Sequence, residues 1–189
     1  CLGYKIQIAL PAKAARALGA VQQDVQRRLP VPLYLSPLRS LHVTVFTMLS
    51  PRSARADKEA VWQCIGPRCR AAFASVGRGL GPIDLLFNGV RVTPTAIIAT
   101  ASDRSGGIDR IRAHFTGLMR ELDLPAPTYT LTHTTLARFP NPASAADEEV
   151  ATISALPLSV AAAVDRVMLI RELVYPALKI DEIAALALA

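Results

Sequence analysis

The sequence predicts an α+β protein built from two similar halves. Segments with the two-residue alternation of strands and segments with the three- and four-residue spacing of helices follow one another, and the same order recurs in the second half. A short phrase, His-x-Thr followed by an apolar residue, occurs on one predicted strand of each half. Of the 189 residues, 51% are hydrophobic and 19% are charged. This composition provides a sizeable core and excludes a disordered or collagen-like chain.

The first half contains two predicted strands, each followed by a helix. Residues 4–10 alternate Tyr and Ile with Lys and Gln, as a half-buried strand does. Residues 14–29 repeat leucine and valine at helical spacing, which predicts an amphipathic helix. After a proline-rich loop, residues 41–49 are rich in β-branched and aromatic side chains and predict a second strand. Residues 54–65 predict a helix that stops at the following Gly-Pro pair, with a resumption through Phe73 left open.

The second half repeats this order with hairpins added. Residues 83–92 and 95–101 predict a pair of strands joined at a Thr-Pro turn. Two glycines precede a helix over 108–122, and residues 129–139 predict the next strand. A helix over 145–156 carries three acidic residues in its first turns, where the helix dipole favours them. The remaining predicted strands cover 158–164, 167–173 and 175–180.

Charge is divided unevenly between the two halves. Residues 1–95 contain 13 basic and 4 acidic side chains, a net charge of +9, whereas residues 96–189 have a net charge of −3. A basic half projects a field that attracts an anionic partner into any cleft it borders. The alternative is a generally cationic surface that serves solubility.

Several classes of protein are disfavoured. No stretch reaches 18 uninterrupted apolar residues, so no membrane span is predicted. Three cysteines are too few for a disulfide scaffold, which favours a reducing, cytoplasmic location. The alternate glycines at 77–81 lack the spacing of a dinucleotide loop, and Cys64 and Cys69 have no histidine near them, so we expect neither cofactor nor metal. The chain opens at Cys1 without an initiator Met, so we expect residues to have been lost upstream, and a removed targeting segment stays open.

The repeated phrase supplies the candidate catalytic residues. Side chains at positions i and i+2 of a strand share a face, so His42 pairs with Thr44 and His133 pairs with Thr135. The two histidines are 91 residues apart, close to half the chain, and two such strands can meet across a pseudo-twofold cleft. A third His-x-Thr begins at His114, in a predicted helix where positions i and i+2 diverge by about 200°. We therefore expect no chemical role for His114.

With these motifs the chain resembles the 2H phosphoesterases, a family named for two His-x-Thr/Ser motifs on opposing strands. The branch it resembles is that of the bacterial 2′-5′ RNA ligases or RNA 2′,3′-cyclic phosphodiesterases. The opening YKIQIALP, the run Thr-Leu-Ala-Arg ending at Arg138, and the closing strand over 167–173 are also similar to that branch. The resemblance implies one bilobal domain over residues 1–189, with an antiparallel sheet and outer helices in each lobe and the active cleft between them. We expect the protein to be monomeric.

Two histidines and two threonines suit the opening of a cyclic phosphodiester. One neutral histidine can take a proton from the attacking water, and one protonated histidine can give a proton to the departing ribose oxygen. Threonine hydroxyls can donate to the non-bridging oxygens, where negative charge gathers. The family resemblance adds that ring opening leaves a 2′-phosphate. The sequence does not assign acid and base between His42 and His133.

Other residues are candidates for substrate binding. Arg39 precedes the first motif and could steer an RNA backbone, although solvated loop arginines are the commoner case. Strict alternation points Arg138 away from the second motif, so a surface ion pair and a place at the rim of the cleft both stay open. The aromatic candidates for stacking on a base, each of which could equally lie in the core, are Tyr34, Phe46, Tyr129 and Tyr175.

The sequence therefore predicts a metal-independent phosphodiesterase that acts on 2′,3′-cyclic phosphates of RNA ends or nucleotides. Ligation or cleavage of 2′-5′ linkages at the same site is one alternative, and a cyclic phosphate of ADP-ribose is another possible substrate class. A non-catalytic RNA-binding module with the same fold is a rival from another class. An unrelated α+β protein with accidental histidines would place the two motifs far apart.

Overall fold

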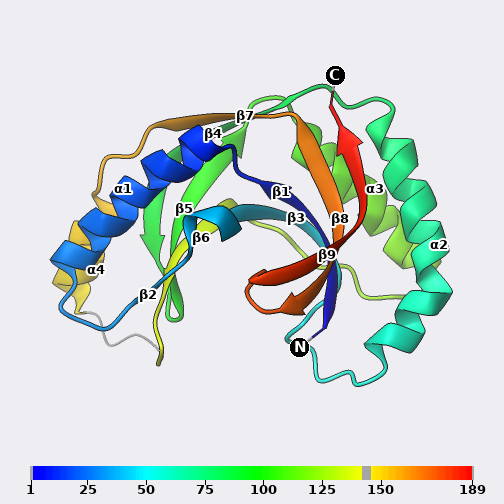
Figure 1. The fold of residues 1–189 in the computed structure, drawn as a ribbon, viewed down its shortest axis with the longest axis horizontal. Helices are drawn as coiled ribbons and strands as arrows, with labels where there is room; N and C mark the ends of the chain where they lie inside the picture. Colours follow the sequence, from blue (N-terminus) through cyan, green and yellow to red (C-terminus); the bar gives the residue numbers. More distant parts are fainter. Residues whose placement is uncertain (1, 142–145, 189) are drawn as a thin grey trace.

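A computed structural model describes residues 2–141 and 146–188, and these form two antiparallel sheets with helices on their outer faces (Figure 1). The four-stranded sheet contains, in spatial order, β3 (His42–Leu49), β1 (Gly3–Ala9), β8 (Arg166–Val174) and β9 (Lys179–Ala187). The five-stranded sheet contains β2 (Tyr34–Leu35), β6 (Thr132–Arg138), β5 (Ala96–Asp103), β4 (Ile83–Val92) and β7 (Val160–Val164). The α+β class and the two sheet lobes predicted from the sequence are confirmed.

The helices are α1 (Ala12–Arg28), α2 (Lys58–Gly77), α3 (Gly107–Glu121) and α4 (Asp147–Ser154), with a short 3₁₀ turn over Leu38–Ser40. Figure 1 shows α1 and α4 on one side of the molecule and α2 and α3 on the other. The helix α1 follows β1 of the four-stranded sheet but packs against β6 and β7 of the five-stranded sheet. Conversely, α3 follows β5 and packs against β3. The chain therefore crosses repeatedly between the lobes, which ties them together.

The helix α3 shows how local sequence and packing act together. Its buried residues recur at helical spacing and include Ile108, Ile111 and Phe115. Gly106 precedes the helix with a φ of 71°, in the left-handed region that favours glycine. The Asp103 carboxylate accepts a hydrogen bond from the backbone N–H of Ile108 at 2.7 Å. This contact satisfies one of the free donors of the first helical turn.

The helix α2 corrects the prediction of a stop at its Gly-Pro pair. It continues through Gly66 and Pro67, with Pro67 inside the helix. The ring of Trp62 stacks on Tyr4 of β1, with 4.1 Å between the ring centroids. Phe73, beyond the proline, is also buried. Packing of both halves of the helix against the core outweighs the hydrogen bond that proline removes.

Three other elements differ from the sequence prediction. Lys5 and Gln7 are buried, so β1 is covered on both faces rather than half exposed. The last strand begins at Lys179 rather than at Tyr175, which lies in the turn between β8 and β9. A short strand, β2, occupies part of the predicted proline-rich loop because its backbone pairs with β6. The predicted start of the fourth helix, residue 145, lies outside the described residues. No helix in the described ranges is long and apolar enough to cross a membrane.

Candidate active site

A cleft of about 440 Å³ brings the four motif residues together. His42 and Thr44 line it from β3 of one sheet, and His133 and Thr135 line it from β6 of the other. The strands β3 and β6 contact each other in the middle of the molecule. All four side chains are partly exposed, as groups that meet a ligand must be. The structure thus shows the juxtaposition that the repeated phrase predicts.

Both motif strands carry a β-bulge immediately after the threonine. The unmatched residue is Val45 in β3 and Leu136 in β6. One extra residue reverses the alternation of the strand, so the fifth residue after each histidine faces the cleft again. These residues are Thr47 and Arg138, and both line the cleft. Strict alternation pointed Arg138 away from the second motif, and the bulge shows that this interpretation was wrong.

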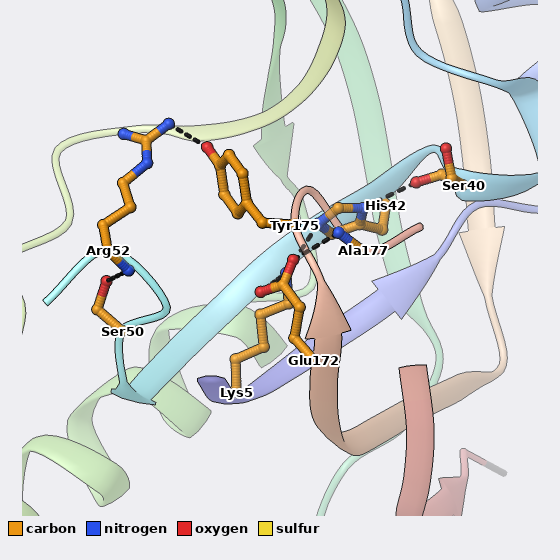
Figure 2. Close-up of polar contacts among 8 residues, drawn as sticks. All are labelled: Lys5, Ser40, His42, Ser50, Arg52, Glu172, Tyr175 and Ala177. Atoms are coloured by element: carbon orange, nitrogen blue, oxygen red, sulfur yellow. Dashed lines mark hydrogen bonds and ion pairs between the residues drawn. The ribbon is translucent and has the colours of Figure 1, made fainter. Parts of the chain in front are cut away.

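Arg138 and Tyr175 form one wall of the cleft. The guanidinium carbon of Arg138 lies 4.9 Å from the ring centroid of Tyr175. The Nε atom of Arg138 is buried and has no hydrogen-bond partner among the described residues. Arg52, which the sequence analysis did not single out, lies 4.9 Å from the same ring and donates to the Tyr175 hydroxyl (Figure 2). Two cations thus meet at an aromatic residue on the rim, a favourable arrangement beside an anionic ligand.

His42 is held by contacts on both ring nitrogens (Figure 2). Its Nδ1–H donates to the backbone oxygen of Ser40 at 2.8 Å, and its Nε2 lies 3.3 Å from Nζ of Lys5. Lys5 pairs with Glu172 at 3.1 Å, and the other carboxylate oxygen of Glu172 accepts the N–H of Ala177. Burial first, and then the nearby Lys5 ammonium, lower the pKa of His42 to about 4.

The sequence analysis did not identify Lys5 and Glu172 as site residues. Lys5 is 5% exposed and Glu172 is fully buried. The available signal was weak, because Lys5 is the one charged residue of β1 but Glu172 shares β8 with Arg166 and Arg171. Opposite charges on neighbouring strands can be buried only as a pair, but the sequence does not show which strands are neighbours.

Arg112 links β3 to the residue that directly precedes β6. Reaching from α3, it donates to the backbone oxygens of Val45, at 3.2 Å, and of Leu131, at 3.1 Å. Its guanidinium carbon lies 4.6 Å from the ring centroid of Tyr129, which lines the cleft. Burial lowers the pKa of His133, and Arg112 and then Arg138 lower it further. Sequence reasoning missed Arg112 because a single arginine on a helix resembles a solvated surface residue.

Two predicted binding residues lie outside the cleft. Phe46 is fully buried, and its ring packs against Phe115 and Tyr129, because the bulge at Val45 turns it toward the core. Arg39 is exposed on the 3₁₀ turn and is not among the residues that line the cleft. The assignment of Phe46 to base stacking was therefore wrong, and the cleft gives Arg39 no binding role.

Replacing Phe46 by leucine tests its place in the core. We expect Phe46→Leu to lower the free energy of unfolding by about 1 kcal/mol, because the smaller side chain leaves part of the ring's space unfilled. Urea unfolding followed by circular dichroism measures the change. Unchanged stability would mean that the ring is not packed against Phe115 and Tyr129.

Two further residues considered in the sequence analysis, His114 and Tyr34, are exposed. His114 is exposed on α3 and is not among the cleft residues, as its helical position predicted. Tyr34 lines the mouth of the cleft and is 42% exposed. Within residues 2–141 and 146–188, no group of three or more His, Cys, Asp or Glu side chains is arranged to hold a metal ion.

No family model and no curated protein matches the sequence. Solved structures do match the fold. Thermus thermophilus TT0787 aligns with a TM-score of 0.72 and 18% identity over 98% of this chain and 97% of that one. Escherichia coli LigT in complex with 3′-AMP aligns with a TM-score of 0.63 and 15% identity, covering 99% of this chain and 97% of LigT. The chain therefore has the LigT fold. A protein described as a phosphoesterase gives a TM-score of 0.65 at 15% identity, covering 100% and 99% of the two chains.

LigT and these other matches are 2H phosphoesterases. The likeness that the two His-x-Thr motifs suggested is therefore confirmed at the level of the LigT fold. The structural match extends over nearly the whole chain and therefore includes both sheet lobes.

Proposed function

We propose that the protein is a phosphodiesterase that opens 2′,3′-cyclic phosphates of RNA ends or nucleotides to 2′-phosphates. One observation carries this proposal: two His/Thr pairs on strands of different sheets line a single cleft. Such a pair of histidines can place a base and an acid on opposite sides of a phosphate, as an in-line displacement requires. Similarity to LigT and to the structure described as a phosphoesterase supports the same reaction class.

The residues of the cleft have complementary tasks in this reaction. One histidine takes the proton of the attacking water, and the other gives a proton to the ribose oxygen that leaves phosphorus. Thr44 and Thr135 donate hydrogen bonds to the non-bridging oxygens as negative charge builds there. Arg138, whose Nε has no partner among the described residues, adds a positive charge on the same side as His133 and Thr135.

The charge of the cleft supports an anionic substrate. Lys5, Arg52 and Arg138 line it, and the carboxylate of Glu172 is already paired with Lys5. Tyr175 and the exposed Tyr34 provide aromatic surface beside these cations, which suits a nucleotide base. LigT has been solved with 3′-AMP, ATP and NADP⁺, and such ligands support a nucleotide or an RNA end as the substrate here.

The decisive experiment offers the protein a short RNA that ends in a 2′,3′-cyclic phosphate. We expect conversion to a 2′-phosphate at an undiminished rate in the presence of EDTA, because imidazole and hydroxyl groups supply the chemistry. Chromatography against 2′- and 3′-phosphate standards identifies the product. His114→Ala is the matched control, since it removes a third His-x-Thr histidine that is not a cleft residue.

Other outcomes distinguish the alternatives. Joining of this RNA to a 5′-hydroxyl acceptor, with no release of 2′-phosphate, would favour 2′-5′ ligation. Binding of the RNA without turnover would contradict the proposal and favour a binding module. A rate that EDTA abolishes and added divalent metal restores would contradict the metal-independent mechanism.

A further inference from the structure

The cleft has two half-sites, β3 with its neighbour β1 and β6 with its neighbour β5. They match in backbone geometry but differ in the strand that supplies the cationic side chain. Each motif strand has a neighbouring strand, β1 beside β3 and β5 beside β6. Opposite Thr47 on β3 the neighbouring residue is Lys5, whereas opposite Arg138 on β6 it is Ala96. In one half the cation therefore comes from the neighbouring strand, and in the other it comes from the motif strand itself. This difference breaks the near symmetry of the two histidines.

The contacts of Ser40 and Lys5 agree on which ring nitrogen of His42 carries a proton and which is an acceptor. The Nδ1 atom donates to the oxygen of Ser40, so it carries a proton. Nε2 faces the ammonium group of Lys5, which is a donor only. Burial lowers the pKa of Lys5, whereas the buried carboxylate of Glu172, 3.1 Å from Nζ, raises it and so favours the ammonium form (Figure 2). His42 is accordingly neutral, and its Nε2 lone pair faces Lys5, which also lines the cleft.

We infer that Lys5, held in place by Glu172, is a positioning residue that makes His42 the general base and leaves His133 as the general acid. This inference rests on the proposed function. It assigns distinct roles to two histidines whose motifs are alike, and it does so through a residue outside both motifs.

The reaction under this assignment is balanced in atoms and charge. The water oxygen bonds to phosphorus while Nε2 of His42 takes the water proton. The bond from phosphorus to the 3′ oxygen breaks, and that oxygen takes a proton from His133, which leaves a 2′-phosphate. His42 then loses its proton to solvent and His133 regains one. The 3.3 Å contact from Lys5 is longer than a usual hydrogen bond, so water can replace it at Nε2 while Lys5 stays with Glu172.

The cationic groups around His42 all disfavour its protonated form. Lys5 on β1 and Arg138 and His133 on β6 all disfavour its protonation, and Glu172 on β8 acts on it through Lys5. The pKa of His133 is also lowered, but its half-site has Ala96 in the place of Lys5. A bound phosphate anion favours protonation of a histidine beside it. The histidine without an ammonium group against its ring is the one that can respond.

Nuclear magnetic resonance titration of the imidazole C–H signals tests the contact without any substrate. The informative variant is Lys5→Met with Glu172→Gln, which removes both charges, nearly preserves volume and keeps an oxygen for the Ala177 N–H. We expect it to raise the proton affinity of His42 about tenfold or more, since an adjacent like charge is lost. His42→Ala and His114→Ala assign the signals.

Two control variants separate charge from packing. Lys5→Arg keeps the cation, so the His42 titration should stay close to that of the unmodified protein. Gln7→Met changes another buried polar residue of β1 and removes no charge, so it too should leave His42 unchanged. If the double variant shifts His42 no further than Gln7→Met does, the inference is overturned. If the double variant does not fold, Lys5→Gln with Glu172→Gln, which replaces the ion pair by two amides, supplies the same comparison.

The pH profile of kcat/KM tests the assignment of roles. The acidic limb reports the base of the free enzyme and the basic limb reports its acid. We expect the double variant to move the acidic limb to higher pH and to leave the basic limb in place. Movement of the basic limb instead would show that His42 is the acid. If neither protein opens a cyclic phosphate, the general-base role fails with the proposed function, and the titration still shows whether Lys5 controls His42.

Discussion

Replacing either His42 or His133 by alanine should lower kcat for cyclic phosphate opening by about 10²–10⁴-fold. Each variant removes one of the two proton transfers, and water must take its place in a cleft whose remaining groups are unchanged. Both histidines line that cleft, so substrate should still bind through Arg138 and Arg52, with a much smaller change in KM. Initial rates over a range of substrate concentrations, with product resolved by chromatography, separate the two constants.

The variant that carries both His42→Ala and His133→Ala gives a second test of the same mechanism. If the two histidines act in one concerted displacement, the combined loss should be only a little greater than the larger single loss. His114→Ala, which changes an exposed histidine of α3, should keep full activity. A single variant that stays within about tenfold of the unmodified protein would show that its histidine transfers no proton in the rate-limiting step.

The arrangement of the motif strands could be predicted because its causes are local. A strand places positions i and i+2 on one face whatever surrounds it, so His42 with Thr44 and His133 with Thr135 followed from spacing alone. That the two strands face one cleft followed from their half-chain separation and from the family resemblance. The structure now shows all four side chains lining that cleft.

The bulges could not be predicted because they depend on the partner strand. Val45 and Leu136 are apolar residues that an ordinary strand would also contain, and only pairing with β1 and β5 leaves them unmatched. Each bulge reverses the direction in which the later side chains of its strand point, which brings Arg138 into the cleft and sends Phe46 into the core. One physical reason therefore decides between the two places left open for Arg138 and overturns the assignment of Phe46.

The charged groups that tune the histidines were hidden for a similar reason. Lys5 and Glu172 lie on strands that are far apart in sequence and become neighbours only in the sheet. Arg112 acts from a helix that follows one sheet and packs on the other. Long-range pairing of this kind leaves no periodic pattern in a single sequence. In the inference above, the same pairing determines which histidine can carry a proton.

The pH dependence of stability provides a measurement of the His42 environment that needs no substrate. In the unfolded chain a histidine has a pKa near 6.5, whereas in the folded protein that of His42 is lowered to about 4. As the pH falls below about 6.5, the side chain of His42 becomes protonated in the unfolded chain but not in the folded protein. The free energy of unfolding therefore decreases. The loss is complete below a pH of about 4 and amounts to about 3 kcal/mol for His42. His133, whose pKa is also lowered, acts in the same direction.

The variant His42→Asn isolates this contribution, because asparagine does not titrate and its amide can still donate to the oxygen of Ser40. Urea unfolding at a series of pH values from 8 to 4 gives the free energy of unfolding of both proteins. Every other titrating group is common to the two, so the difference between the curves belongs to His42 and to the groups coupled to it. We expect the unmodified protein to lose about 3 kcal/mol more than the variant over this range. Parallel curves would mean that water reaches His42 freely and that neither burial nor Lys5 restrains its protonation.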